Sequence, residues 1–510
     1  MKITIGLCTP NPGWEIVLSQ EGFSFEKIDT VTDINAFALI IPDTELIRKQ
    51  KKQLLKFMNN GGIVIVDKDT SSLLGDVKYI TRNIKYVIPD NNSIFHFLGL
   101  IDCYTQFQIP ADNALVKWDE DCKIYEYPEG RGRIVILPFS VNELILSQTS
   151  IRKRFFAQRK ELPSEVVSQN NKRKIREIIS LIIQKSYRKM NLPVVKKNVF
   201  PDRMKNTFIF RVDTDFCSGE DAQNVYDLCK KYDIKATWFV DTRDERLLSD
   251  VYRNFADHEI SLHCEHHAVY ASYKKNFDHF TPALEKLQEN GITAKGFAAP
   301  FGDWNEALGQ VIEDLGFEYS SEFALDYDDV PFYPFFNDHF SLVLQIPIHP
   351  ISIGRLRRSH FTDKEMIKYY KKVIDYNFSH NLPAIIYHHP HHKRLNVIEE
   401  IFSYIKTKNV WNPTLLDFSL WWKKRTENNF SCSFTHDLIT VNSSDQDMCY
   451  KIITEDGSTA TIQPNRENKL DDLNFTKAEP IQFDEKKYMR QYFWRDSLNN
   501  YEQRKAKKKQ

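Results

Sequence analysis

The sequence predicts an α/β protein in which helices cover parallel sheets. In the first 150 residues, short apolar runs at 2–8, 37–42, 63–67 and 133–138 alternate with a helical pattern at 46–59 that ends before Gly61-Gly62. Beyond residue 203, further apolar runs end in acidic or histidine residues. Strands that alternate with helices indicate parallel sheets. A chain of 510 residues also exceeds one hydrophobic core.

Shifts in composition divide the chain into four parts, at 1–150, 151–202, 203–425 and 426–510. Segment 151–200 holds fourteen Lys or Arg against three acidic residues, with a helical stripe of Ile175, Ile178, Ile179 and Ile182. It predicts a solvated, basic helical connector; the alternative is a patch for an anionic ligand or a membrane surface. Residues 431–462 predict a small β-rich appendix with a hairpin at Asp456-Gly457, and the basic run 504–509 predicts a disordered tail.

The charge balance limits the partners. Lys plus Arg equals Asp plus Glu, at 69 each, so no global field attracts nucleic acid or an anionic membrane. No run of eighteen apolar residues predicts a transmembrane helix, and the eight cysteines form no Cys-x-x-Cys pair. We expect a soluble, cytoplasmic protein with no nucleic-acid partner. The oligomeric state stays open.

Two acidic residues end the apolar run at 208–212. Asp213 and Asp215 are two positions apart, so both project from the same side of a strand at its carboxyl end. Such a pair suits a metal ligand beside a general base. A loop cap is the alternative for this motif taken alone. Asp326, Asp328 and Asp329 are an acidic loop that could shape a substrate groove.

A histidine pair follows at a spacing of four. His263 and His267 lie on one side of a helix or a strand, so both imidazoles can reach one cation. Chance occurrence is the alternative for this pair by itself. Cys264 lies between them and faces away if the segment is extended.

These motifs occur in an order that resembles the polysaccharide deacetylase family, also called the NodB-homology family or carbohydrate esterase family four. The resembling segments are 213–215, 235–240, 259–267, 296–305, 315–321 and 383–390. The resemblance implies a distorted (β/α)7 barrel with its site at the carboxyl ends of the strands. It implies a metal-dependent hydrolase that removes N-acetyl or O-acetyl groups from a glycan or glycan precursor.

The resemblance also implies roles for single residues. Asp215, His263 and His267 would hold a divalent cation, most often zinc, which polarises the acetyl carbonyl and activates water. Asp213 would be the catalytic base, and His389 the catalytic acid; His388 is the alternative. The backbone of Phe301 would contact the oxyanion, and Trp304 is a second candidate for substrate binding. His391 and His392 are expected in an exposed loop.

The chain departs from the family at Ala298, where relatives carry an Arg that orients the base. We hypothesise that Arg211, on the same strand face as Asp213, supplies that charge and keeps Asp213 ionised. An outward-facing Arg211 is the alternative. If Ala298 abolishes catalysis, the chain would be a glycan-binding or scaffold protein with a degenerate barrel. Hydrolysis of another amide is a third possibility.

The first 150 residues resemble the flavodoxin-like fold of class I glutamine amidotransferases. The segments that carry this resemblance are 38–43, 61–66 and 130–139. An active member would need a nucleophilic cysteine at a strand-to-helix turn, and here Val66 is followed by Asp67-Lys68-Asp69. We therefore expect a domain without a catalytic nucleophile.

Overall fold

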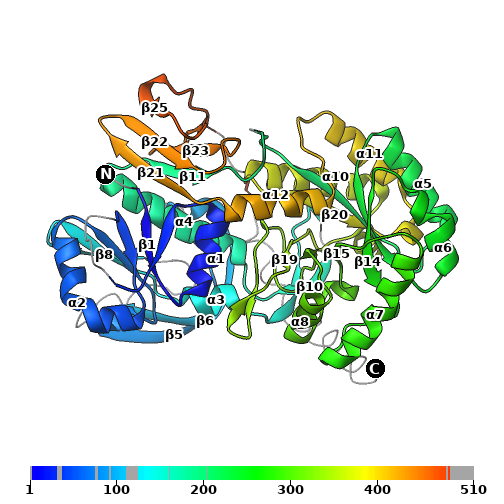
Figure 1. The fold of residues 1–510 in the computed structure, drawn as a ribbon, viewed down its shortest axis with the longest axis horizontal. Coiled ribbons are helices and arrows are strands. Elements are labelled where there is room, and N and C mark those ends of the chain that lie inside the picture. Colours follow the sequence, from blue (N-terminus) through cyan, green and yellow to red (C-terminus); the bar gives the residue numbers. More distant parts are fainter. Residues whose placement is uncertain are drawn as a thin grey trace.

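The computed structural model of the chain describes residues 3–30, 37–74, 78–90, 93–110, 124–159, 161–202, 204–477 and 481–482. Two α/β units lie side by side, the first in blue and cyan and the second in green and yellow (Figure 1). Orange strands from the C-terminal part lie above the first unit. Within the described ranges, no helix combines the length and apolar character that crossing a membrane requires. The basic run 504–509 lies outside those ranges.

The first unit contains a six-stranded sheet. Its strands, in spatial order, are β2 (Phe25–Ile28), β1 (Ile5–Cys8), β3 (Leu39–Ile41), β4 (Ile63–Val66), β8 (Gly132–Ile136) and β7 (Tyr125–Glu129). All neighbours are parallel except β7, which is antiparallel to β8. β1, β3 and β4 are buried along their whole length, as continuous apolar runs predict for a sheet covered on both faces. The four strands predicted from the apolar runs are confirmed.

Helices and a hairpin complete this unit: α1 (Pro12–Glu21), α2 (Thr44–Asn59), α3 (Val141–Leu146), β5 (Tyr79–Val87) and β6 (Ile101–Pro110). The predicted helix at 46–59 is α2. It begins where the Asp43 side chain accepts a hydrogen bond from the Leu46 backbone at 2.7 Å. It ends before Gly61, whose φ of 104° suits glycine.

The connector differs from the solvated helix that the sequence predicts. A hairpin of β9 (Ser150–Arg154) and β10 (Ser164–Ser168) precedes α4 (Lys172–Lys189), and β11 (Val194–Lys197) follows it. The expectation of a solvated face is wrong for α4, because Lys172, Arg173, Lys174 and Arg176 are all buried. The Ile stripe is buried as well, so α4 is covered on several sides.

Acidic side chains from both units compensate the buried cations of α4. The Arg176 guanidinium donates to Glu21 at the end of α1, and to the carboxylate of Asp329 in the second unit at 2.5 Å. Burial by itself raises the pKa of Glu21, but Lys196 and Arg176 outweigh it and lower that pKa to about 2. Asp326 is buried in the same region, so neither it nor Asp329 shapes a solvated groove.

The second unit contains a seven-stranded sheet in which every neighbouring pair is parallel. Its strands, in spatial order, are β19 (Leu344–Gln345), β16 (Tyr319–Ser320), β15 (Gly296–Phe297), β14 (Glu259–Cys264), β13 (Ala236–Asp241), β12 (Phe208–Asp213) and β20 (Ala384–His388). The sheet curls into a half-barrel. The strand pairing does not close the predicted barrel, because β19 and β20 are edges of the described sheet. A hydrogen bond of 2.9 Å from the His349 backbone N–H to Ile385 bridges this gap.

Helices surround this sheet (Figure 1). They are α5 (Gly219–Lys231), α6 (Glu245–Asp250), α7 (Tyr273–Glu289), α8 (Glu306–Asp314), α9 (Ile353–Arg358), α10 (Asp363–Ser379), α11 (Leu395–Lys406) and α12 (Leu415–Glu427). The short hairpin of β17 (Phe335–Phe336) and β18 (His339–Phe340) lies in the loop before β19. The carboxyl ends of the strands stay open to the cavity described below.

The C-terminal part is rich in antiparallel strands, as expected. β21 (Phe430–Thr435), β22 (Leu438–Ser443) and β25 (Glu467–Lys469) form one small sheet. β23 (Tyr450–Ile453) and β24 (Thr459–Ile462) form the hairpin around Gly457, and β11 pairs with β23. The appendix therefore includes a strand from the connector.

We expect Arg176→Met to destabilise the protein. The substitution leaves the buried Glu21 and Asp329 without their shared cation, and breaking a buried pair costs about 3 to 5 kcal/mol of the free energy of unfolding. Urea unfolding measures the change. Lys49→Met is the matched control, because Lys49 and Glu45 form an exposed pair on α2, and we expect it to change the free energy of unfolding far less than Arg176→Met does. Equal effects of the two substitutions would contradict the role of Arg176.

Candidate metal centre and cavity

Asp213 and Asp215 lie where β12 ends. All six residues of β12 are buried, which fixes the strand in the sheet and presents its end to the cavity. Asp213 is the last residue of the strand, and Asp215 follows it in the loop. Both side chains line the cavity, as their spacing predicts.

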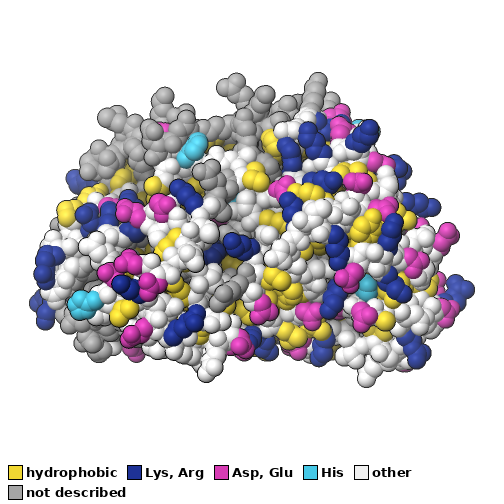
Figure 2. Space-filling view, turned by 90° about the horizontal axis from the view of Figure 1, so that it is seen from above, with side chains coloured by type: hydrophobic (Ala, Val, Ile, Leu, Met, Phe, Trp, Pro, Cys, Tyr) yellow, Lys and Arg dark blue, Asp and Glu magenta, His cyan; other side chains and the backbone are white. Residues whose placement is uncertain are grey.

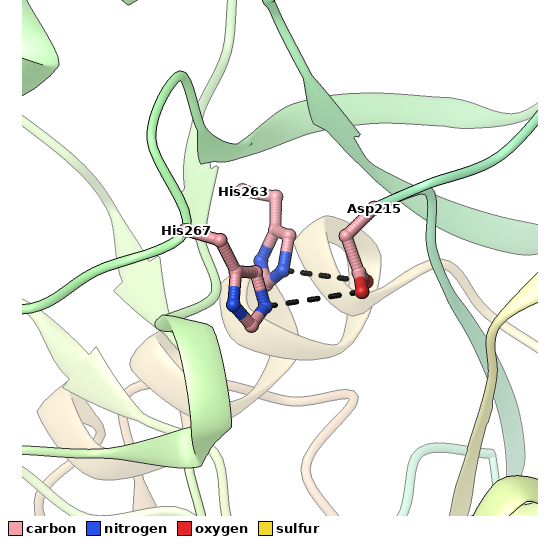
Figure 3. A group of neighbouring side chains, drawn as sticks. All are labelled: Asp215, His263 and His267. Atoms are coloured by element: carbon pink, nitrogen blue, oxygen red, sulfur yellow. Dashed lines mark ion pairs between the residues drawn. The ribbon is translucent and has the colours of Figure 1, made fainter. Parts of the chain in front are cut away.

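His263 and His267 approach Asp215 from β14 and from the loop after it. The Nε2 atom of His263 is 3.6 Å from one oxygen of the Asp215 carboxylate, and the Nε2 atom of His267 is 3.8 Å from the other. Figure 3 shows both imidazoles facing this carboxylate. Ligands about 2.1 Å from a tetrahedral cation lie about 3.4 Å from one another. The separations therefore fit a shared cation.

Unsatisfied polar atoms support the same conclusion. Oδ1 of Asp215 and Nε2 of His263 are buried without a hydrogen-bond partner. The Nδ1–H of His263 donates to the carbonyl of Ala298 at 2.7 Å, which leaves Nε2 as the free lone pair, as in metal-binding histidines. The three side chains place one ligand atom each within 4.8 Å of one another. A divalent cation would satisfy all of these groups.

Burial also sets the protonation of these groups. It raises the pKa of Asp215, so the negative charge lacks compensation from the protein alone. It lowers the pKa of His267 to about 4, which leaves the imidazole neutral at pH 7. A neutral imidazole and a carboxylate that needs a cation are the forms that bind zinc.

The two adjacent histidines of the last strand point to opposite faces. His389 lines the cavity, and its Nε2 atom is 3.4 Å from Oδ1 of Asp215. His388 is fully buried on the other side, and both of its ring nitrogens lack a partner. Burial lowers the pKa of His389 well below its usual range, so its ring is neutral in the resting site. The structure thus brings His389, and not His388, to the metal centre.

Arg211 contacts Asp213 through a two-pronged interaction. Its Nε and one terminal nitrogen donate to the two carboxylate oxygens at 2.7 and 2.8 Å. The remaining terminal nitrogen donates to the carbonyl of Ser321. Arg211 is only 1% exposed, so this carboxylate and carbonyl replace its hydration. The guanidinium therefore lies directly beneath Asp213, on the strand face that the sequence predicted.

A cavity of about 350 Å³ lies over these groups. Besides the acids and histidines already described, residues from several other segments line it: Glu165, Phe216, Phe301, Ser352, Gly354, Arg355, Arg358, Tyr387, His391 and His392. The expectation that His391 and His392 belong only to an exposed loop is therefore wrong. The turn after β20 folds back over the cavity, so both rings face it.

Trp304 does not reach this cavity. Its ring is 9% exposed and packs against Phe336, with centroids 5.6 Å apart, and against Gly309 of α8. The local chain directs the indole into the core, so the expectation of substrate contact is wrong for Trp304. Phe301 does line the cavity and is 56% exposed.

Sequence reasoning missed Phe216, whose ring, like that of Phe301, contacts the ring of His267. Its ring is 63% exposed, and both phenylalanines have positive φ values, 56° and 62°. Such a backbone is unfavourable for a bulky residue and is found mostly at functional positions. An exposed Phe directly after an Asp-x-Asp motif was the only local signal. Glu165, Arg355 and Arg358 carry no motif at all.

Part of the chain that holds this site matches a known family. Residues 212–320 match the polysaccharide deacetylase family. The match includes Asp213, Asp215, His263 and His267 but ends before β20 and His389. No curated protein matches the chain in a sequence search.

Several solved structures are similar to part of the chain. A putative polysaccharide deacetylase from Mycobacterium smegmatis is 16% identical, with 44% of this chain and 93% of that chain covered and a TM-score of 0.39. A probable polysaccharide deacetylase from Pseudomonas aeruginosa is also 16% identical, with 46% of this chain and 95% of that chain covered and a TM-score of 0.37. A family 4 acetyl xylan esterase from Clostridium thermocellum, in complex with a cobalt ion, is 16% identical, with 42% of this chain and 91% of that chain covered and a TM-score of 0.31.

We expect His263→Gln to weaken binding of Zn²⁺ by about 100-fold or more, because it removes one of three protein ligands. Metal content after dialysis and calorimetric titration with Zn²⁺ measure this. His266→Gln is the control, since this neighbouring ring is exposed and stacks on His279 away from the centre. Wild-type affinity in His263→Gln would exclude the proposed ligand set.

Proposed function

We propose that the chain is a metal-dependent carbohydrate deacetylase that hydrolyses N-acetyl or O-acetyl groups of a glycan or a glycan precursor. The observation that carries this proposal is the convergence of Asp215, His263 and His267 beside a carboxylate, Asp213, that a buried arginine holds in place. The family match at 212–320 supports the same reaction.

The residues of the cavity have complementary tasks in this proposal. A divalent cation, zinc by its ligand set, would supply Lewis acidity toward the acetyl carbonyl and toward water when bound. Asp213 accepts a proton from the attacking water. His389 is neutral at rest, so in this scheme it takes up the proton that Asp213 has accepted and passes it to the leaving amine or alcohol. The backbone N–H of Phe301 donates to the developing oxyanion.

Phe216 and Phe301 support a carbohydrate as the substrate. Two exposed rings that both contact His267 offer apolar surface to the C–H faces of a sugar ring. Their positive φ values imply that the surrounding structure holds them there at a cost. A binding role explains why that cost is retained.

The alternative is a non-catalytic glycan-binding protein, which Ala298 motivates. The contact of Arg211 with Asp213 favours the enzyme, because it places a guanidinium on the base without an arginine at position 298. Ala298 instead contributes its carbonyl to His263.

We propose for the first unit a flavodoxin-like fold without an active site of its own. The strand order β2-β1-β3-β4-β8 is that of flavodoxin-like sheets, which supports the fold. Asp67 follows β4, and its buried carboxylate accepts hydrogen bonds from backbone N–H groups, including that of Val141. These hydrogen bonds give Asp67 a structural role in the turn after β4.

Turnover of an acetylated chito-oligosaccharide by the Zn²⁺-loaded protein, with a chelator control, tests the proposed function. We expect Asp213→Asn to reduce turnover by about two to four orders of magnitude, because the base is lost. Bound metal should stay near the wild-type level. Loss of metal in this variant would show that Asp213 and Asp215 have exchanged roles; the absence of wild-type turnover would favour the scaffold.

Arg211 is a positioning residue in this scheme. We expect Arg211→Lys to lower kcat by about 10- to 100-fold with little change in KM, because a point charge cannot hold both oxygens of Asp213. Arg211→Met should lower kcat further, and bound Zn²⁺ should stay constant in both. Steady-state kinetics and metal analysis separate these effects. An Arg211→Met protein that folds normally and retains full turnover would refute this role.

A further inference from the structure

Two of the three arginines that line the cavity are paired with carboxylates. Arg211 pairs with Asp213, and the guanidinium of Arg355 in α9 donates to the carboxylate of Glu165 in β10, with one contact at 3.0 Å. Arg358 is an exposed residue that also lines the cavity. Within the described part of the chain, its guanidinium forms no ion pair and no hydrogen bond.

The packing of α9 places Arg358 at the cavity. Ile353 and Leu356 are buried and attach one face of the helix to the core. Gly354 lies against the His392 ring so closely that a Cβ atom there would be 2.2 Å from it. Arg358 follows Gly354 by four residues, so the two share the helix face toward the cavity.

Arg357, the neighbour of Arg358 in α9, points away from the cavity. It is also exposed, but it does not line the cavity, because successive helical residues point about 100° apart. The same helix therefore carries one arginine at the site and one away from it.

The rest of the surface does not attract anions in a general way. The chain carries equal numbers of acidic and basic residues, and Figure 2 shows both kinds interspersed on the face seen from above. Any selection for charge must therefore come from a local group. An arginine is suited to this, because its fork binds carboxylate or phosphate oxygens through two hydrogen bonds.

We propose that Arg358 selects acetylated sugars that bear an anionic group, a carboxylate or a phosphate, as the substrates of this cavity. This inference rests on the proposed deacetylase function. It adds a substrate class that the metal centre and the base do not determine.

The test compares three sugars with the Zn²⁺-loaded full chain: N-acetylglucosamine, N-acetylmuramic acid and N-acetylglucosamine 6-phosphate. The first is neutral, the second carries a carboxylate and the third a phosphate. We expect higher kcat/KM for at least one anionic sugar, and a decrease of that advantage with rising salt. The sugar that is preferred distinguishes a carboxylate from a phosphate.

Arg358→Gln should reduce the anionic-to-neutral ratio of kcat/KM by about tenfold or more, chiefly through KM. Arg358→Lys should retain part of the preference. Arg357→Gln is the matched control and should leave the ratio as in the wild type. No wild-type preference, or an equal loss in Arg357→Gln, would overturn the inference.

Calorimetric binding of the same sugars gives a readout that does not need turnover. If no sugar is hydrolysed but the anionic ones bind more tightly and depend on Arg358, the deacetylase proposal fails and the charge selection stands. If the sugars are hydrolysed without regard to charge, the deacetylase proposal stands and the selection fails.

Discussion

The buried cations of α4 are the constraint on which the arrangement of this protein depends. An arginine removed from water needs a carboxylate, and Arg176 has one from each α/β unit, Glu21 and Asp329. These contacts fix the two units relative to each other. They also hold the connector in place, and through it Glu165 of β10, which reaches the cavity and orients Arg355. The first unit is thus linked, through the connector, to a residue that lines the cavity.

The fold could be predicted where local sequence determines it. Continuous apolar runs such as Ile63–Val66 specify buried parallel strands, and Asp43 with Gly61 marks the limits of α2. The basic connector could not be predicted, because lysines and arginines are usually solvated. The acid that accounts for the burial of Arg176 lies 153 residues away along the chain. The edges of the curled sheet likewise depend on contacts between distant segments.

In the candidate site, too, some features could be predicted from local sequence and others depend on contacts between distant segments. The spacings of two and four residues predicted that Asp213 lies beside Asp215 and His263 beside His267, and the family resemblance led us to expect that the two pairs meet, as they do at the strand ends. The side chains around them were not predictable. Whether a ring such as Trp304 or Phe301 faces the cavity depends on the path of a loop. Arg358 lines the cavity from α9, which packs against His392 through Gly354.

The pair His388 and His389 shows that chemical identity is a small part of what a residue contributes. Two imidazoles joined by one peptide bond have opposite surroundings, since a strand alternates its faces. The pairing of Val212 with His388 determines which ring meets Asp215 and which is enclosed in hydrocarbon. The alignment of two neighbouring strands therefore decides which ring faces the candidate metal centre. In this respect the hydrogen bonds between β12 and β20 are as much a part of the candidate site as the side chains at the ends of these strands.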